Sequence, residues 1–195
     1  MTCIVGFVEN GVTWMGADSL CSNGRSVAIE KRPKAFHSKD SSDIVIGGTT
    51  SFRMLQLLQY SNGLFDELSL SKNQINHEYM VSKFIPNLQK LFSEGGFQRI
   101  DNGVKESGVF LLGYKDNLFK IQSDYSVLEN ETNYNACGCG KDFAMGSLKT
   151  TEGTGLPPEV KIRKALQAAS VFSTGVAPPF IIVNTGNTDV IKFED

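Results

Sequence analysis

Residues 1–19, MTCIVGFVENGVTWMGADS, decide the fold. The run CIVGFV is apolar on both alternating faces, which predicts a strand buried on both sides. Asn10-Gly11 is a strong hairpin signal, and VTWMGAD predicts a second strand that pairs back on the first. The segment therefore predicts an antiparallel β-hairpin that begins immediately after Thr2.

Thr2 follows Met1, and removal of Met1 would give Thr2 a terminal α-amine beside its own hydroxyl. A threonine hydroxyl is a poor nucleophile until a base takes its proton. An α-amine, with a reference pKa of about 7.7–8, can do this near neutral pH. An N-terminal threonine is a convergent variant of the Ser-His-Asp triad, so Thr2 is a candidate nucleophile. Asp18 follows sixteen residues after Thr2, and Lys34 sixteen residues after Asp18.

Further strands and helices alternate in blocks along the chain. The pattern predicts strands at 34–38, 43–48, 108–114, 117–123, 179–185 and 189–194, with a loop or irregular hairpin at 19–33. It predicts helices at 52–60, from 76 to the Gly95-Gly96 pair, at 141–148 and at 160–172, with a loop at 61–74. Pro86 is expected to kink or interrupt the second helix. This order predicts an α+β fold in which two antiparallel sheets pack together with helices on both outer sides, in one domain spanning 1–195.

The ordered motifs resemble the proteasome β-subunit and HslV family of N-terminal-nucleophile hydrolases over most of the chain. The shared features are Thr2 before a short apolar strand, a strand ending at Asp18 and Ser19, Lys34 in KAFHS, the run DIVIGG before a helix, and GCGKDFAMGSL at 138–148. The resemblance implies the four-layer αββα sandwich of the Ntn-hydrolase fold.

The resemblance also implies roles for individual residues. Thr2 would be the nucleophile, and Asp18 would hold Lys34 through a charged hydrogen bond. Lys34 would make the Thr2 hydroxyl more acidic and help to keep the α-amine neutral. The backbone N–H of Gly47 would stabilise the oxyanion. Ordinary structural interpretations remain: a strand-end cap for Asp18, a surface charge for Lys34 with Lys31 as the alternative, and a tight turn at Gly47.

The chain departs from the family pattern at two places. Cys139 stands where the family often has a serine, and is either a small packed side chain or a thiol that replaces that serine near the amine. The Asp and Ser that follow the next helix in proteasome subunits fall near Ser173 and Val176, so an HslV-like protein is the closer match. By alignment, the substrate pocket would be formed by Cys21, Arg32, Val45 and Thr49, with Arg53 as a further candidate.

Composition disfavours several other classes of protein. The formal net charge is −2 and there is no long basic run, so nucleic acid and anionic membranes are not expected partners. The N-terminus lacks a signal-peptide pattern, and no apolar run approaches the roughly 18 residues of a membrane span. The four cysteines lack zinc-site spacing, and two histidines leave no three-histidine metal centre. We therefore expect a cytoplasmic protein with reduced thiols, no metal and no cofactor.

The sequence favours a threonine-type peptidase subunit that cleaves peptide bonds through an acyl-enzyme on Thr2. The family resemblance implies a homo-oligomeric ring fed by an ATP-dependent unfoldase, with protein or peptide substrates. Two alternatives stay open: a catalytically inactive scaffold subunit and a small-molecule amidase on the same fold. Retention of Met1 would favour the scaffold, because the Thr2 nitrogen would then be an amide.

Overall fold

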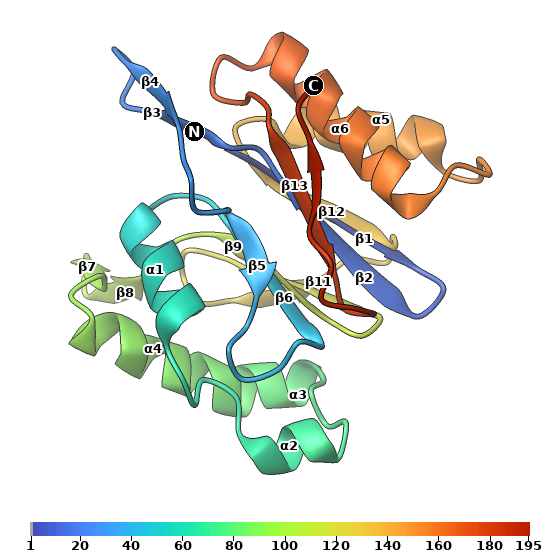
Figure 1. Ribbon diagram of the computed structural model, residues 1–195. Helices are drawn as coiled ribbons and strands as arrows, with labels where there is room; N and C mark the ends of the chain where they lie inside the picture. The colour runs from blue at the N-terminus through green and yellow to red at the C-terminus, as the bar shows by residue number, and fades with distance from the viewer. Residues whose placement is uncertain (1) are drawn as a thin grey trace.

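The computed structural model describes residues 2–195 and contains the expected N-terminal hairpin (Figure 1). Strand β1 (Cys3–Glu9) pairs antiparallel with β2 (Val12–Ala17). Asn10 and Gly11 both have positive φ, 53° and 78°, as a two-residue type I′ turn requires. The Asn-Gly signal therefore predicted the turn correctly.

This hairpin forms the centre of the first sheet. The strand order is β12-β1-β2-β13-β14, with β12 at Tyr134–Gly138, β13 at Phe180–Asn184 and β14 at Ile191–Phe193. Strand β12 pairs antiparallel with β1, so Cys3 lies opposite Gly138. The N-terminal residues and a strand from the last third of the sequence thus meet beside Thr2.

The second sheet also has five antiparallel strands, in the order β11-β10-β9-β6-β5. Its strands are β5 (Ala35–His37), β6 (Ile44–Gly48), β9 (Phe110–Tyr114), β10 (Asn117–Ile121) and β11 (Val127–Glu129). Two small hairpins complete the strands: β3 (Leu20–Ser22) with β4 (Val27–Ile29), and β7 (Arg99–Asp101) with β8 (Val104–Glu106).

Helices cover the outer face of each sheet (Figure 1). The second sheet is covered by α1 (Phe52–Tyr60), α2 (Glu67–Ser71), α3 (His77–Tyr79), the π-helical turn η1 (Met80–Phe84) and α4 (Ile85–Glu94). The first sheet is covered by α5 (Lys141–Thr151) and α6 (Pro158–Phe172). The expected α+β fold with two antiparallel sheets between helical layers is confirmed.

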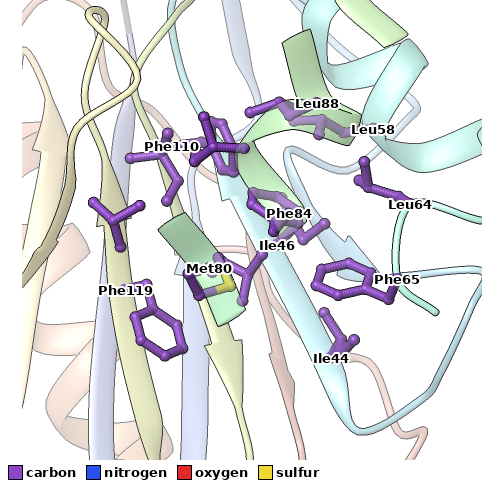
Figure 2. Packing of buried hydrophobic residues seen from close by; sticks show 14 of the residues in the cluster. Ile44, Ile46, Leu58, Leu64, Phe65, Met80, Phe84, Leu88, Phe110 and Phe119 are labelled. Atoms are coloured by element: carbon purple, nitrogen blue, oxygen red, sulfur yellow. The ribbon is translucent and has the colours of Figure 1, made fainter. Parts of the chain in front are cut away.

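Three hydrophobic clusters correspond to the three interfaces of these four layers. Ile4 and Val45 belong to the cluster between the two sheets. Val5 and Phe7, on the opposite face of β1, pack with α5 and α6. The largest cluster joins the second sheet to α1–α4, and Figure 2 shows Phe84 and Leu88 over Ile46 and Phe110 in this cluster. The strands CIVGFV and DIVIGG are apolar on both faces because each lies between two of these interfaces.

Some local predictions were wrong. The stretch 61–74, expected to be a loop, contains α2, which begins where Asp66 caps the N–H of Ser69. Strands β7, β8, β11 and β12 were not predicted. The disturbance expected at Pro86 takes the form of the π-helical turn η1 directly before α4, where the N–H of Ile85 donates to the carbonyl of Met80. Within residues 2–195, no helix is both long and apolar enough to cross a membrane.

Candidate active site

Thr2 directly precedes β1 in the first sheet. Its hydroxyl is buried, and Oγ1 accepts a hydrogen bond from Lys34 Nζ at 3.0 Å. Lys34 directly precedes β5 in the second sheet and is 1% exposed. Packing of the sheets against each other therefore brings the Thr2 hydroxyl to the lysine ammonium.

Asp18 completes this arrangement from the end of β2. Both carboxylate oxygens lie 3.1 Å from Lys34 Nζ, and they also accept the backbone N–H groups of Cys3 at 2.9 Å and Leu20 at 3.0 Å. Lys34 Nζ donates further to the Leu20 carbonyl at 2.6 Å. An ammonium has three N–H donors, and Thr2, Asp18 and Leu20 supply an acceptor for each. The lysine is therefore held in one position against the Thr2 hydroxyl.

Burial governs the electrostatics of this pair. It raises the pKa of the Asp18 carboxyl, while the Lys34 ammonium and the N–H groups of Cys3 and Leu20 act in the opposite direction. A buried ion pair of this kind loses its hydration and depends on good geometry for compensation. Three donor groups around the carboxylate, Lys34 Nζ and the N–H groups of Cys3 and Leu20, provide that geometry, so the pair can place a positive charge beside Oγ1.

Cys139 approaches Thr2 from the other side, in the turn after β12. The Thr2 backbone nitrogen donates to Cys139 Sγ at 3.3 Å, and the thiol in turn lies 3.4 Å from the Thr2 carbonyl oxygen. Ser173, just after α6, donates its hydroxyl to the same sulfur at 3.3 Å. Gly138 makes the approach possible: it has φ +96°, and a Cβ there would lie 2.1 Å from the Thr2 carbonyl oxygen.

The two glycines of β6 occupy different environments. Gly48 donates its N–H to the Lys34 carbonyl at 3.0 Å, and Thr49 donates to the Val109 carbonyl at 3.2 Å. Because successive N–H groups on a strand point to opposite neighbours, the Gly47 N–H lies on the side of β9. A Cβ on Gly47 would contact Ile4 in the sheet-to-sheet core. Gly48 lines the cavity beside Thr2, whereas Gly47 does not.

A cavity of about 160 Å³ opens beside Thr2 and Lys34. Of the residues expected to form the substrate pocket, Cys21 and Thr49 line it. Arg32 and Arg53 instead line a second cavity of about 500 Å³. Val45 is fully buried in the core between the sheets and lines neither of these cavities. The structure thus groups two of the four expected pocket residues with Thr2.

Sequence reasoning missed other residues that line the smaller cavity. They come from the end of β3, the end of β6, the connection after it and the first turn of α1: Ser22, Gly48, Thr50, Ser51, Phe52 and Leu55. Thr50 has a positive φ of 71°, unusual for a β-branched residue, and its Oγ1 accepts the Val109 N–H at 3.2 Å. The only sequence signal for this wall of the cavity was the pair Gly47-Gly48 just before the helix at 52–60.

The remaining site predictions lie apart from the Thr2 hydroxyl or outside the described residues. Ser19 is buried, but its hydroxyl donates to the Pro179 carbonyl at 2.7 Å and so ties the end of β2 to the segment before β13. The expected removal of Met1 concerns a residue outside the described range 2–195. All four cysteines are free thiols.

The fold of the chain is similar to that of solved structures, although no protein-family model and no curated protein matches its sequence. Among solved structures, HslV from Trypanosoma brucei is similar with a TM-score of 0.68 and 18% identity, over 93% of this chain and 98% of that chain. BPH from Thiobacillus denitrificans, in complex with epoxomicin, is similar with a TM-score of 0.69 and 16% identity, over 93% of this chain and 97% of that chain. The resemblance to HslV-type proteins is therefore confirmed at the level of the fold.

Proposed function

We propose that this chain is an N-terminal threonine peptidase subunit that cleaves peptide bonds after Met1 has been removed. The observation that carries the proposal is the 3.0 Å contact between Lys34 Nζ and Thr2 Oγ1, with Asp18 holding the ammonium in place. The other acceptors around Lys34, the Asp18 carboxylate and the Leu20 carbonyl, hold the ammonium in position, and the remaining N–H is directed at the Thr2 hydroxyl. A buried lysine directed at a threonine hydroxyl beside a cavity suits nucleophilic catalysis.

The proposed reaction has two stages. The α-amine of Thr2 takes the hydroxyl proton while Oγ1 attacks the peptide carbonyl, and the same proton then passes to the leaving amine of the product. This leaves an ester between Oγ1 and the acyl half of the substrate. Water, deprotonated by the α-amine, hydrolyses the ester and restores Thr2. Lys34 stabilises the negative charge that develops on Oγ1, at no cost in reorganisation because it is already in contact.

Cys139 and Gly47 have supporting roles in this proposal. The Cys139 thiol, 3.3 Å from the Thr2 nitrogen, would orient the amine toward its own hydroxyl. Gly47 remains the predicted oxyanion donor, but its N–H lies on the β9 side of β6, so this role requires the amide to turn toward Thr2. Gly48 is closer to the cavity and would need to release the Lys34 carbonyl to serve instead.

The family resemblance extends the proposal to the assembly. A homo-oligomeric ring would enclose the Thr2 sites, an ATP-dependent unfoldase would deliver unfolded polypeptide, and the particle would work in the cytoplasm. The fold shared with HslV supports this extension. Enclosure would also explain how a peptidase with a small cavity avoids folded proteins, since only extended chains could reach Thr2.

The test is hydrolysis of a varied set of fluorogenic peptides by samples whose intact mass is known. Chains that begin at Thr2 should be active, chains that retain Met1 inactive, and Thr2→Ala should lose at least about 10³-fold in kcat/KM. Thr188→Ala, at an exposed loop position, is the matched control and should keep the wild-type rate. Incubation with epoxomicin should add its mass to wild type and not to Thr2→Ala.

Two results would overturn the mechanism. Equal activity with and without Met1 would exclude the α-amine as the base. No activity in either form, across all peptides and with a candidate unfoldase present, would favour the inactive scaffold subunit.

A further inference from the structure

Two cavities lie next to each other on the face that carries Thr2. The smaller, about 160 Å³, contains Thr2 and Lys34, and the larger, about 500 Å³, is lined in part by Arg32, Arg53 and Tyr60. Phe52 and Leu55 are the residues that line both cavities. These two side chains of α1 therefore form the boundary between the cavities.

Phe52 and Leu55 differ in how firmly they are fixed. Leu55 is 6% exposed and belongs to the large hydrophobic cluster beneath α1. Phe52 is 38% exposed and lies outside that cluster. It is the first residue of α1, and the Ser51 hydroxyl fixes the start of the helix by accepting the Arg53 N–H at 3.1 Å. The backbone at Phe52 is thus anchored, while its ring can be changed without emptying the core.

The chemistry of the smaller cavity is uncharged apart from Lys34. Its wall presents the thiol of Cys21, the hydroxyls of Thr49, Thr50 and Ser51, and the apolar surface at Phe52. The three N–H groups of Lys34 already donate to Thr2, Asp18 and the Leu20 carbonyl, so none is left for a substrate carboxylate. A charged side chain would enter this cavity without a counter-charge and lose its hydration.

We infer that Phe52 is the specificity-determining residue of the proposed peptidase. Together with the fixed Leu55, it separates the smaller cavity from the larger one, and so limits the substrate side chain next to Thr2 to a small or medium-sized uncharged group. This inference rests on the proposed function and names its substrate class: peptides with alanine, valine, leucine or threonine on the acyl side of the cleaved bond. Removing the Phe52 ring would join the two cavities and admit bulky side chains.

The experiment uses fluorogenic peptides that differ only in the residue on the acyl side of the cleaved bond: Ala, Val, Leu, Phe, Trp, Lys or Glu. Wild type should favour Val and Leu over Trp, Lys and Glu by at least about tenfold in kcat/KM, the size expected when a pocket excludes a poorly fitting group. Phe52→Ala should raise the Trp-to-Val ratio by at least about tenfold, mainly through a lower KM for the Trp peptide. Phe52→Leu should give an intermediate ratio.

Phe143→Ala is the matched control. It removes the same ring from a phenylalanine that is similarly exposed, at 41%, but lines neither cavity. Its Trp-to-Val ratio should equal that of wild type. Circular dichroism and thermal melting verify that each variant folds, and Phe52→Leu carries the test if Phe52→Ala does not fold.

The outcomes separate this inference from the function on which it rests. Thr2-dependent hydrolysis with an unchanged Trp-to-Val ratio in both Phe52 variants would overturn the role of Phe52 alone. A wild-type preference for Lys or Glu would likewise overturn the assigned substrate class. Absence of Thr2-dependent hydrolysis for every peptide would instead overturn the proposed function, and this inference with it.

Discussion

Lys34 has three kinds of acceptor around one buried ammonium group: a hydroxyl, a carboxylate and a backbone carbonyl. The hydroxyl of Thr2 and the carboxylate of Asp18 come from the first sheet, and the lysine comes from the second. The ammonium therefore links the sheets at the position where the candidate nucleophile lies. Removing either charged partner should affect both reactivity and stability, but not equally.

We predict that Asp18→Ala destabilises the protein more than Lys34→Met, although both variants lose most activity. Asp18→Ala leaves a buried ammonium without a counter-charge, a change that costs about 3–5 kcal/mol when one partner of a buried pair is removed. Lys34→Met leaves a carboxyl that still accepts the N–H groups of Cys3 and Leu20 and can take up a proton. Urea unfolding near pH 7 measures both free energies. Wild-type rates in Lys34→Met would instead make Lys31 the candidate residue.

Lys34→Met should also change how stability depends on pH. Burial raises the pKa of Asp18 in the folded state, and loss of Lys34 removes an opposing influence. Between the unfolded pKa of about 3.9 and this raised value, the folded state binds more protons than the unfolded state. The free energy of unfolding of Lys34→Met, taken as its difference from wild type, should therefore be highest below about pH 4. It should fall as the pH rises from about 4 through the raised pKa of Asp18. Urea titrations at several pH values measure it, and a parallel pH profile for the two proteins would contradict it.

The four cysteines should react with thiol reagents in an order set by burial. Cys3 and Cys137 are buried, and burial raises the pKa of both thiols, that of Cys137 to about 12. We expect maleimide to modify exposed Cys139 first, half-buried Cys21 next, and the other two only after unfolding. On the proposed function, modification of Cys139 stops hydrolysis because the adduct lies against the Thr2 nitrogen.

Peptide mapping by mass spectrometry after timed labelling gives the order of modification. Cys139→Ser is the control, because it should resist inactivation by maleimide while retaining activity. Rapid labelling of Cys137 in the folded protein would refute the predicted order.

At the scale of residues, spacing predicted more about the catalytic candidates than about the pocket. The spacing of Thr2, Asp18 and Lys34 along the chain matched the family pattern, and the structure brings these three side chains together. Val45 could not be assigned from sequence, because the run DIVIGG is apolar on both faces and does not show which face meets the other sheet. Arg32 lies in the connection between β4 and β5. The sequence alone did not show the path of this connection, and so did not show which cavity Arg32 lines.

At the scale of elements, the most consequential strand is one that the sequence did not indicate. Strand β12 reads YNACG, which lacks both the alternation and the β-branched residues that mark a strand. It is nevertheless the partner of β1 and brings Cys139 to Thr2. Its position is dictated by tertiary pairing rather than by local preference. The π-helical turn before Pro86 is similar, because a proline predicts a disturbance without specifying its form.

Helix α6 is anchored to the N-terminal hairpin by an unequal ion pair. Lys161 is 3% exposed, lies 2.6 Å from Glu9 and is 4.9 Å from the centre of the Phe7 ring, whereas Glu9 is 28% exposed. We predict that Glu9→Gln costs more stability than Lys161→Met. The first leaves a buried charge poorly compensated, by about 1–3 kcal/mol, while the second leaves a carboxylate that water can reach. Thermal and urea unfolding of both variants measure the difference, and an equal or reversed order would contradict the asymmetry.

At the scale of the whole molecule, the separation of the two sheets depends on small residues where the sheets are closest. A Cβ on Gly113 of β9 would lie 2.5 Å from Thr13 Cγ2 on β2, in the opposite sheet. The layer order was predictable from the blocks of strands and helices. The closeness of the sheets was not, because a glycine in a strand does not show what faces it.

Gly113→Ala should therefore destabilise the protein by about 1–3 kcal/mol, as expected for overpacking of a close interface. Gly146→Ala is the opposite case: the position is in α5, has nothing within 4 Å of an added Cβ, and should gain about 0.5–1 kcal/mol because alanine favours a helix. The midpoints of urea unfolding compare the two variants directly. Destabilisation by both, or by neither, would show that the contacts across the sheets do not set the stability at Gly113.

On the proposed function, the pairing of β1 with β12 determines when in folding the molecule can become catalytically active. Thr2 contacts Lys34 and Cys139, which are 32 and 137 positions away along the chain. Contacts of such long sequence separation form late, after loop-closure entropy has been overcome. During synthesis, a ribosome-bound chain would carry Thr2 long before Cys139 had been made. On the proposed function, a nascent or misfolded copy therefore has a nucleophile with no environment to activate it, and proteolytic capacity emerges only in a molecule that has completed folding.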